Sequence, residues 1–80
     1  MNVQRAAQRT VDSFVAAVPR QDASTRPKAT LAHLRWMNDR IQSSEVSGEK
    51  AHRWLGWMQA VVYLGGRATI EQLKQVNFES

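Results

Sequence analysis

The chain has 80 residues, with eleven lysines and arginines against seven acidic residues, so its net charge is +4. It contains no cysteine, which excludes disulfides and thiolate metal sites. A chain of this length forms one small domain that buries roughly 60–65% of its unfolded surface, so its core is small unless it oligomerises. No apolar run is long enough for a signal peptide or a membrane span, and we expect a cytoplasmic protein that contacts no membrane.

The first predicted element is an amphipathic helix over residues 2–18, which Pro19 ends. Its apolar face, at helical spacing, comprises Val3, Ala7, Val11, Phe14, Val15 and Val18. Residues 19–27, PRQDASTRP, have a proline at each end and polar or small residues between, which predicts a linker. The segment 1–18 therefore either folds back on the rest of the chain or pairs as an arm with another subunit.

A second helix is predicted over residues 28–43. Its apolar stripe consists of Leu31, Leu34, Met37 and Ile41. Trp36 lies off this stripe, with His33 and Arg40 flanking it. Tryptophan and arginine are enriched at the energetic centres of protein interfaces, so Trp36 is the first candidate for a contact residue. The alternative is that the N-terminal helix covers Trp36.

The third predicted helix runs from about 48 to 64, and Gly65-Gly66 ends it. Ser47 is its expected N-cap, and Val46 and Ala51 are placed to form a hydrophobic staple. The connection from the second helix is short, so we expect these two helices to form an antiparallel hairpin.

Two faces are predicted for the third helix. An arc about half the circumference wide is apolar and comprises Ala51, Trp54, Leu55, Trp57, Met58, Val61, Val62 and Leu64. We interpret the two tryptophans as core, or as core plus interface. The opposite strip comprises His52, Gly56, Gln59 and Tyr63. It is either a solvated face or a contact surface in which Gly56 lets a partner approach closely.

Thr69 is predicted to cap a short final helix, with Gln72 completing a capping box. Ile70, Leu73 and Val76 form its expected buried side. The sequence therefore predicts an all-α fold, a small helical bundle in a single domain. A helical hairpin with a short C-terminal helix occupies residues 28–80, and the helix of residues 1–18 joins it across the linker 19–27.

Patterns typical of catalysis are missing from the sequence. There is no phosphate-binding glycine loop, no nucleophile elbow and no pair of carboxylates spaced for acid–base work. His33 and His52 have no further ligands at metal-binding spacing, so we interpret both as surface or packing residues. We predict that the protein is not an enzyme and needs no metal or cofactor.

The positive net charge makes nucleic acid an alternative partner. The residues that would serve it are Arg20, Arg26, Lys28, Arg35 and Arg40. The third helix is mostly apolar and lacks the polar first turns of a recognition helix, so base readout is not expected. Weak electrostatic binding to the phosphate backbone is the alternative function that remains.

The stretch RWLGWMQAVVYLGGRATIEQLKQVN, residues 53–77, is similar to the C-terminal part of small proteins from tailed bacteriophages and prophages. The similarity begins near Leu31, so residues 1–27 lie outside it. No active site is known in that family, and no functional residue is carried over from it. The resemblance implies a non-enzymatic protein that binds a host or phage protein, for example to block a defence system or redirect a regulator.

The leading hypothesis is therefore an accessory protein that inhibits or redirects its partner by stoichiometric binding. Its predicted contact residues are Trp36, Arg40 and His33, followed by His52, Gln59 and Tyr63. A nucleic-acid-associated regulator is one alternative. A self-assembling module in which residues 1–18 pair between subunits is the other, and a homodimer or higher oligomer fits the surplus of apolar helix faces.

Overall fold

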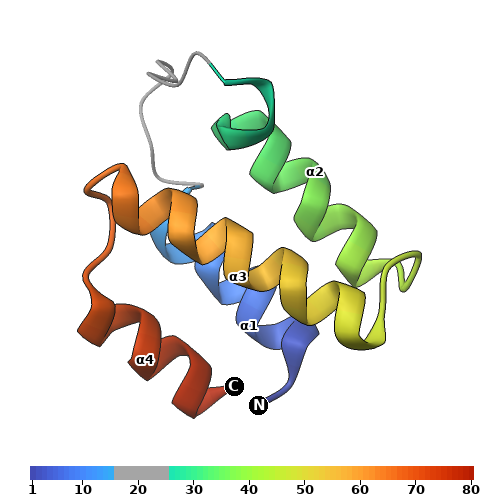
Figure 1. Ribbon diagram of the computed structural model, residues 1–80. Helices are drawn as coiled ribbons and strands as arrows, with labels where there is room; N and C mark the ends of the chain where they lie inside the picture. Colours follow the sequence, from blue (N-terminus) through green and yellow to red (C-terminus); the bar gives the residue numbers. More distant parts are fainter. Residues whose placement is uncertain (16–25) are drawn as a thin grey trace.

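The computed structural model describes residues 1–15 and 26–80. These residues form four α-helices and one short 3₁₀ helix, with no strand among them, which confirms the predicted all-α class. The helices are α1 (Val3–Phe14), η1 (Pro27–Ala29), α2 (Leu31–Gln42), α3 (Gly48–Leu64) and α4 (Ile70–Glu79) (Figure 1). None of the helices in this part of the chain is both long and apolar enough to span a bilayer.

The N-terminal helix α1 folds back and packs against α2, α3 and α4. Its buried side is made mostly of small residues, Ala6, Ala7, Thr10 and Val11, which lets the neighbouring helices approach closely. The apolar face of α1 is thus used inside the chain's own core rather than as an arm. Residues 16–25, including Val18, Pro19 and most of the predicted linker, lie outside the described residues.

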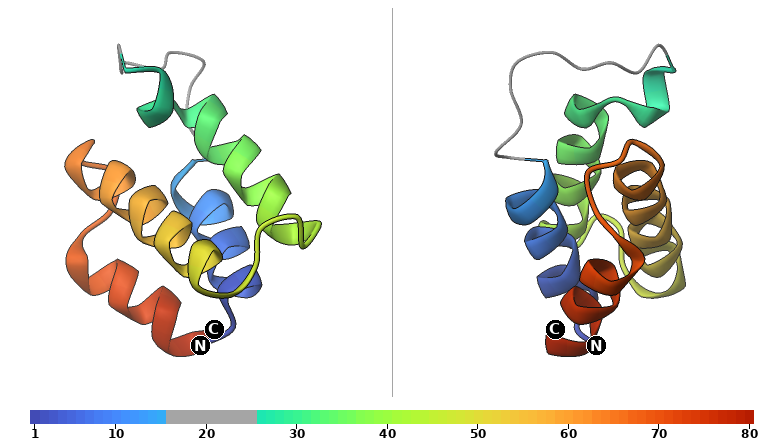
Figure 2. Two further views of the ribbon diagram at one scale, coloured as in Figure 1. Left: turned by 45° about the vertical axis from the view of Figure 1, so that its right-hand side comes forward. Right: turned by 90° about the vertical axis from the view of Figure 1, so that its left-hand side faces the viewer.

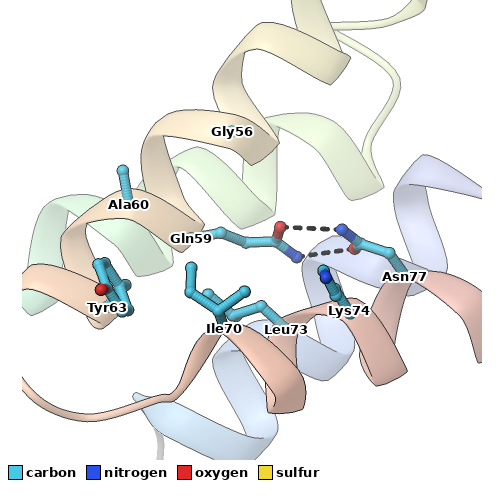
Figure 3. A pocket seen from close by; sticks show the side chains of 8 residues that line it. All are labelled: Gly56, Gln59, Ala60, Tyr63, Ile70, Leu73, Lys74 and Asn77. Atoms are coloured by element: carbon cyan, nitrogen blue, oxygen red, sulfur yellow. Dashed lines mark hydrogen bonds between the residues drawn. The ribbon is translucent and has the colours of Figure 1, made fainter.

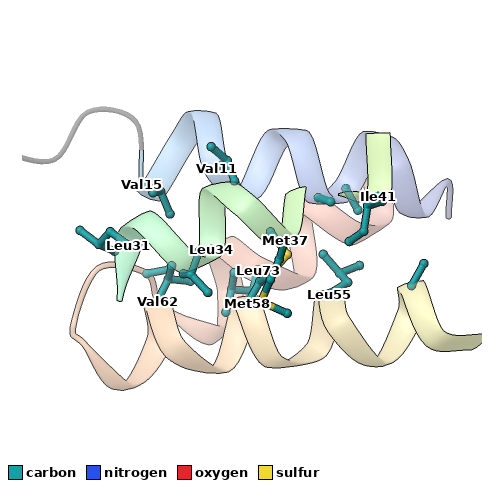
Figure 4. Packing of buried hydrophobic residues seen from close by; sticks show 14 of the residues in the cluster. Val11, Val15, Leu31, Leu34, Met37, Ile41, Leu55, Met58, Val62 and Leu73 are labelled. Carbon is teal, nitrogen blue, oxygen red and sulfur yellow. The ribbon is translucent and has the colours of Figure 1, made fainter. Parts of the chain in front are cut away.

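The core lies where α1, α2 and α3 meet, and Leu73 of α4 closes one edge (Figure 4). The predicted stripe of α2 is buried throughout, from Leu31 to Ile41. This helix begins at Leu31 rather than at residue 28, because the Thr30 side chain caps it by accepting a hydrogen bond from the His33 amide at 3.0 Å. Pro27 starts η1 instead.

Helices α2 and α3 run in opposite directions, as predicted, and diverge from the loop of residues 43–47 that joins them (Figure 1). Ser44 in this loop has a φ of 66° and accepts a hydrogen bond on its hydroxyl from Gln4 Nε2 of α1 at 3.2 Å. Ser47 stands at the N-cap position of α3, but its side chain makes no capping hydrogen bond. Val46 and Ala51 are both buried in the core, as the predicted staple requires.

The turn between α3 and α4 follows the sequence signals closely. Gly66 has a φ of 74°, and the next amide, of Arg67, donates to the Val62 carbonyl at 2.9 Å. The capping box of Thr69 and Gln72 is present with both of its hydrogen bonds. Leu73 and Val76 are buried as predicted.

Ile70 corrects the prediction for α4, because it is 43% exposed. The reason is that α4 packs on α1 and stands off from α3, so the first turn of α4 borders an open space. The two termini lie side by side (Figure 2), and the Asn2 amide donates to the Ser80 carbonyl at 2.8 Å. Arg9 of α1 and Glu79 of α4 add an ion pair of 2.6 Å nearby.

Side-chain amides line the contact between α1 and α2. Gln4 Nε2 donates to the Ile41 carbonyl at 3.1 Å, and Gln42 Nε2 returns a hydrogen bond to the Gln4 carbonyl at 2.7 Å. Asn38 Nδ2 donates to Gln8 Oε1 at 3.1 Å. Such directional bonds fix the register of two helices whose apolar contacts alone would tolerate sliding.

Candidate functional site

The buried side of α3 is displaced from the predicted arc. Its buried residues are Ala51, Leu55, Met58, Gln59 and Val62. Trp54 is partly buried and packs on the core. The expectation of burial was wrong for Leu64, which is 81% exposed, whereas Trp57 is 46% exposed and is therefore not purely core. Helix α3 packs more extensively on α1 than on α2. The edge of the predicted arc that carries Trp57 and Leu64 therefore faces outward.

Aromatic and cationic side chains gather where the outward sides of α2 and α3 meet, and we call this surface the aromatic seam. It consists of His33, Trp36 and Arg40 of α2 and Lys50, Trp54 and Trp57 of α3. The Trp36 ring stacks on His33 with centroids 5.3 Å apart and meets Trp54 at 5.6 Å. Trp36 remains 48% exposed, so the alternative in which α1 covers it is not what the structure shows.

The rings of the aromatic seam are held in place by their neighbours. The Trp57 indole Nε1 donates to the Lys28 carbonyl of η1 at 2.8 Å. Lys50 Nζ lies 5.6 Å from the Trp54 ring, and the Arg40 guanidinium lies 6.0 Å from the Trp36 ring, both within cation–π range. Rings that are already oriented lose little further freedom when a partner covers them.

Arg40 is the most constrained cation of the seam. Its Nη1 donates to both carboxylate oxygens of Glu45, at 3.1 and 3.2 Å. Its Nε is buried and makes no hydrogen bond. Glu45 therefore neutralises Arg40, and Lys50 is the lysine of the aromatic seam that remains without an ion pair.

A groove of about 320 Å³ separates α3 from α4, and we call it the α3–α4 groove (Figure 3). It is lined by Gly56, Gln59, Ala60 and Tyr63 of α3 and by Ile70, Leu73, Lys74 and Asn77 of α4. Two hydrogen bonds cross it, from Gln59 Nε2 to Asn77 Oδ1 at 2.8 Å and from Asn77 Nδ2 to Gln59 Oε1 at 3.1 Å.

Gln59 corrects the prediction of a partner contact. Its side chain is buried, and its Nε2 also donates to the Thr10 hydroxyl of α1 at 3.2 Å. Gln59 therefore ties α3 to both α1 and α4. The spacing of Leu55, Gln59 and Val62, four and then three residues apart, is the signal that would have placed it on the buried side.

The six predicted contact residues do not form one surface. Trp36, Arg40 and His33 come together in the aromatic seam, and Tyr63 lies exposed at the α3–α4 groove. His52 is exposed and its Nδ1 lies 3.0 Å from the Gly48 carbonyl of its own helix. It borders a separate hollow beside Met1 and Asn2.

Helices α2 and α4 lie on either side of α3 (Figure 1), so the aromatic seam and the α3–α4 groove flank the outward side of α3. We call the seam, the groove and the outward side of α3 between them the open side. Among the described residues, seven large apolar side chains are exposed, and five of them belong to the open side. These five are Trp36, Trp57, Tyr63, Leu64 and Ile70. Sequence reasoning missed Leu64 and Ile70 as surface residues because it assigned both of them to buried sides, and it left Trp57 open between core and core plus interface.

The cations of the nucleic-acid alternative are dispersed. Arg20 lies outside the described residues. Arg35 donates to the Val15 carbonyl at the end of α1 at 3.3 Å, whereas Arg40 belongs to the aromatic seam. Arg26 and Lys28 lie at η1. Arg35 and Arg40 are five residues apart on α2 and point to different sides of it.

The open side combines large exposed apolar side chains with a small number of polar groups. Its polar groups are indole, imidazole, phenol, amide, guanidinium and ammonium groups. Within residues 1–15 and 26–80, no three histidines or carboxylates converge as a metal site would require. No family model, no curated protein and no solved structure matches this chain.

Proposed function

We propose that this chain is a non-enzymatic protein that binds another protein in a fixed ratio through its open side. The concentration of five exposed large apolar side chains on that side supports the proposal. A small protein seldom leaves a large apolar surface in water unless a partner covers it. The opposite side of the molecule, formed by α1, carries none of the five.

The residue types of the aromatic seam support the same proposal. Tryptophan, tyrosine and arginine dominate the binding energy of protein interfaces when they lie near the centre of the buried area. Trp36 is supported by Trp54 beneath it and by His33 beside it. We place Trp36 and Trp57 at the centre of the interface, with Lys50 at its rim.

The partner and the consequence of binding follow from the resemblance of residues 31–77 to small phage and prophage proteins. That resemblance favours a host or phage protein in the bacterial cytoplasm as the partner. Binding there would inhibit or redirect the partner, since a chain of this size works by covering a surface. Identification of the partner tests both parts of this proposal.

The test is affinity capture from bacterial lysate, with half of the lysate treated with nuclease. Three baits are compared: the wild type, Trp36→Ala, and Phe78→Ala as the matched control. Phe78 is an aromatic residue that is 87% exposed and lies at the end of α4, outside the open side. Circular dichroism checks that each bait is folded.

We expect one protein in stoichiometric amount that survives nuclease, binds the wild type and Phe78→Ala alike, and binds Trp36→Ala at least about tenfold more weakly. Equal capture by all three baits would reject the open side as the binding surface. Capture that disappears with nuclease would reject protein binding and support a nucleic-acid partner.

A further inference from the structure

The α3–α4 groove offers an occupant an apolar surface. Gln59 and Asn77 exchange two hydrogen bonds across its floor, so their amide groups are already paired with each other (Figure 3). Ala60, Tyr63, Ile70 and Leu73 supply most of the remaining lining. An occupant gains little by presenting polar groups to this floor, and its contacting side must be apolar.

Gly56 forms one wall of the groove and has no role inside the fold. It lies in the middle of α3, where glycine weakens a helix relative to alanine. A Cβ atom built on Gly56 meets nothing within 4 Å, so no neighbouring element requires its absence. Its missing side chain leaves room for an approaching backbone from outside the chain.

Lys74 is the one charged side chain that lines the groove, and it makes no hydrogen bond or ion pair with any described residue. On or beside the open side, the cations without an ion pair are Lys28, Lys50, Arg53, Arg67 and Lys74. They outnumber the carboxylates without an ion pair over the same range, residues 27–79, which are Asp39, Glu49 and Glu71. The electrostatic complement of this surface is acidic.

We infer that the α3–α4 groove receives an acidic amphipathic helix of the protein partner, with apolar side chains in the groove and a carboxylate opposite Lys74. The inference rests on the proposed function, which it deepens by naming the chemistry of the partner. From Ile70 to Asn77 the groove follows about two turns of α4, a length that accommodates apolar anchors at positions i, i+4 and i+7 of a docked helix. A second copy of this chain fits poorly, because it would bring its own positive excess to the same surface.

The test uses two synthetic 18-residue helices with the same leucine stripe, one with glutamate and one with lysine on the polar face. Each is titrated into the ¹⁵N-labelled full chain, at low and at moderate salt, and read by amide chemical shifts. We expect the glutamate peptide to shift the amides of Gly56, Ala60 and Lys74 and to bind at least tenfold more tightly than the lysine peptide. Moderate salt should narrow this difference.

Three variants locate the binding. Lys74→Glu should weaken the glutamate peptide at least fivefold. Arg5→Glu, which makes the same charge change on exposed α1, should leave it within twofold. Gly56→Leu should fill the groove and weaken the glutamate peptide at least tenfold, while circular dichroism shows an intact fold.

Several outcomes would overturn the inference. The first is that the two peptides bind equally, or that neither binds. The second is that the chemical-shift changes are confined to residues outside the groove. The third is that sedimentation shows the chain associating with itself through the groove. If the peptides fail while capture still depends on Trp36, the groove inference is wrong and the proposed function stands. If the glutamate peptide binds in the groove but capture from lysate ignores Trp36, the proposed function fails instead.

Discussion

The two sides of α3 present different chemistry. Toward α1, α3 contributes Leu55, Met58 and Val62, which are almost fully buried, and Gln59, whose amide is bonded to Thr10 and Asn77. On its outward side, Trp57 and Leu64 stay exposed although both are large and apolar. The inner side is thus closed by packing and by paired polar groups, whereas the outer side leaves its apolar groups uncovered.

The comparison shows which residues the fold itself requires. A chain of this size has few large apolar side chains with which to build a core. Burying a tryptophan removes more apolar area from water than burying most other side chains and therefore contributes strongly to stability. All three tryptophans nevertheless lie on the open side, where two of them are about half exposed. The structure therefore separates apolar residues that hold the helices together from apolar residues that the fold leaves uncovered.

The largest difference between the two sides is expected for two apolar truncations in the same helix. Met58→Ala should lower the free energy of unfolding by about 2–5 kcal/mol, because Met58 is fully buried between the helices. Leu64→Ala should change it by less than about 0.5 kcal/mol, because that side chain is in water. Denaturant unfolding of both variants measures the difference, and similar losses would contradict the assignment of the two sides.

A second prediction tests the paired amides of the inner side. Gln59→Leu leaves the Asn77 amide and the Thr10 hydroxyl without one of their partners and should cost about 1–3 kcal/mol in unfolding free energy. The double variant Gln59→Leu with Asn77→Leu should recover part of this loss, since both partners of the main pair are then apolar. Denaturant unfolding of both single variants and of the double variant is the measurement. If the double variant loses as much unfolding free energy as the two single variants added together, Gln59 and Asn77 are not coupled.

The smallest effect is expected at the exposed junction of the two termini. Hydrogen bonds from Gln75 and Arg9, together with the positive charge of Arg9, hold the pKa of Glu79 below its ordinary value of 4.5. A carboxyl group with a lowered pKa stabilises the folded state above its ordinary pKa, and this contribution is lost as the pH falls through the folded-state pKa. Because the pair is exposed, the contribution is small.

Glu79→Gln should therefore be slightly less stable than the wild type at neutral pH and equally stable well below pH 4. Thermal unfolding across that range, at low salt, is the measurement. A constant difference between the two proteins at every pH would show that the Arg9–Glu79 pair does not supply this stability.

Much of the fold could be predicted because its signals are local. The bounds of α3, the capping box of Thr69 and Gln72, and the buried stripe of α2 each depend on residues a few positions apart. The start of α2 was misplaced because the capping threonine, Thr30, follows a proline that favours a 3₁₀ turn. Local signals of this kind were present and could have been used.

The surface was harder to predict, because exposure depends on which helix covers which. The apolar arc of α3 contains Trp57 and Leu64, yet the neighbouring helices cover the side of α3 that carries Leu55, Met58 and Val62. Gln59 looked like a surface residue because it is polar, and its hydrogen-bond partners Thr10 and Asn77, both distant in the sequence, explain its burial. The candidate site is therefore partly predicted. Trp36, His33 and Arg40 of the aromatic seam were named in advance, and so was the strip that carries Gly56 and Tyr63 on the α3 wall of the groove. The α4 wall of the groove was not predicted.

The most direct test of the account is photo-crosslinking in living bacteria from the open side and from outside it. Trp57 is replaced by p-benzoylphenylalanine in one strain and Phe78 in another, and crosslinked products are separated and identified by mass spectrometry. The account predicts one discrete heterologous product from position 57 and none from position 78. Crosslinking to the same products from both positions, or from neither, would contradict the claim that the open side is where this protein binds its partner.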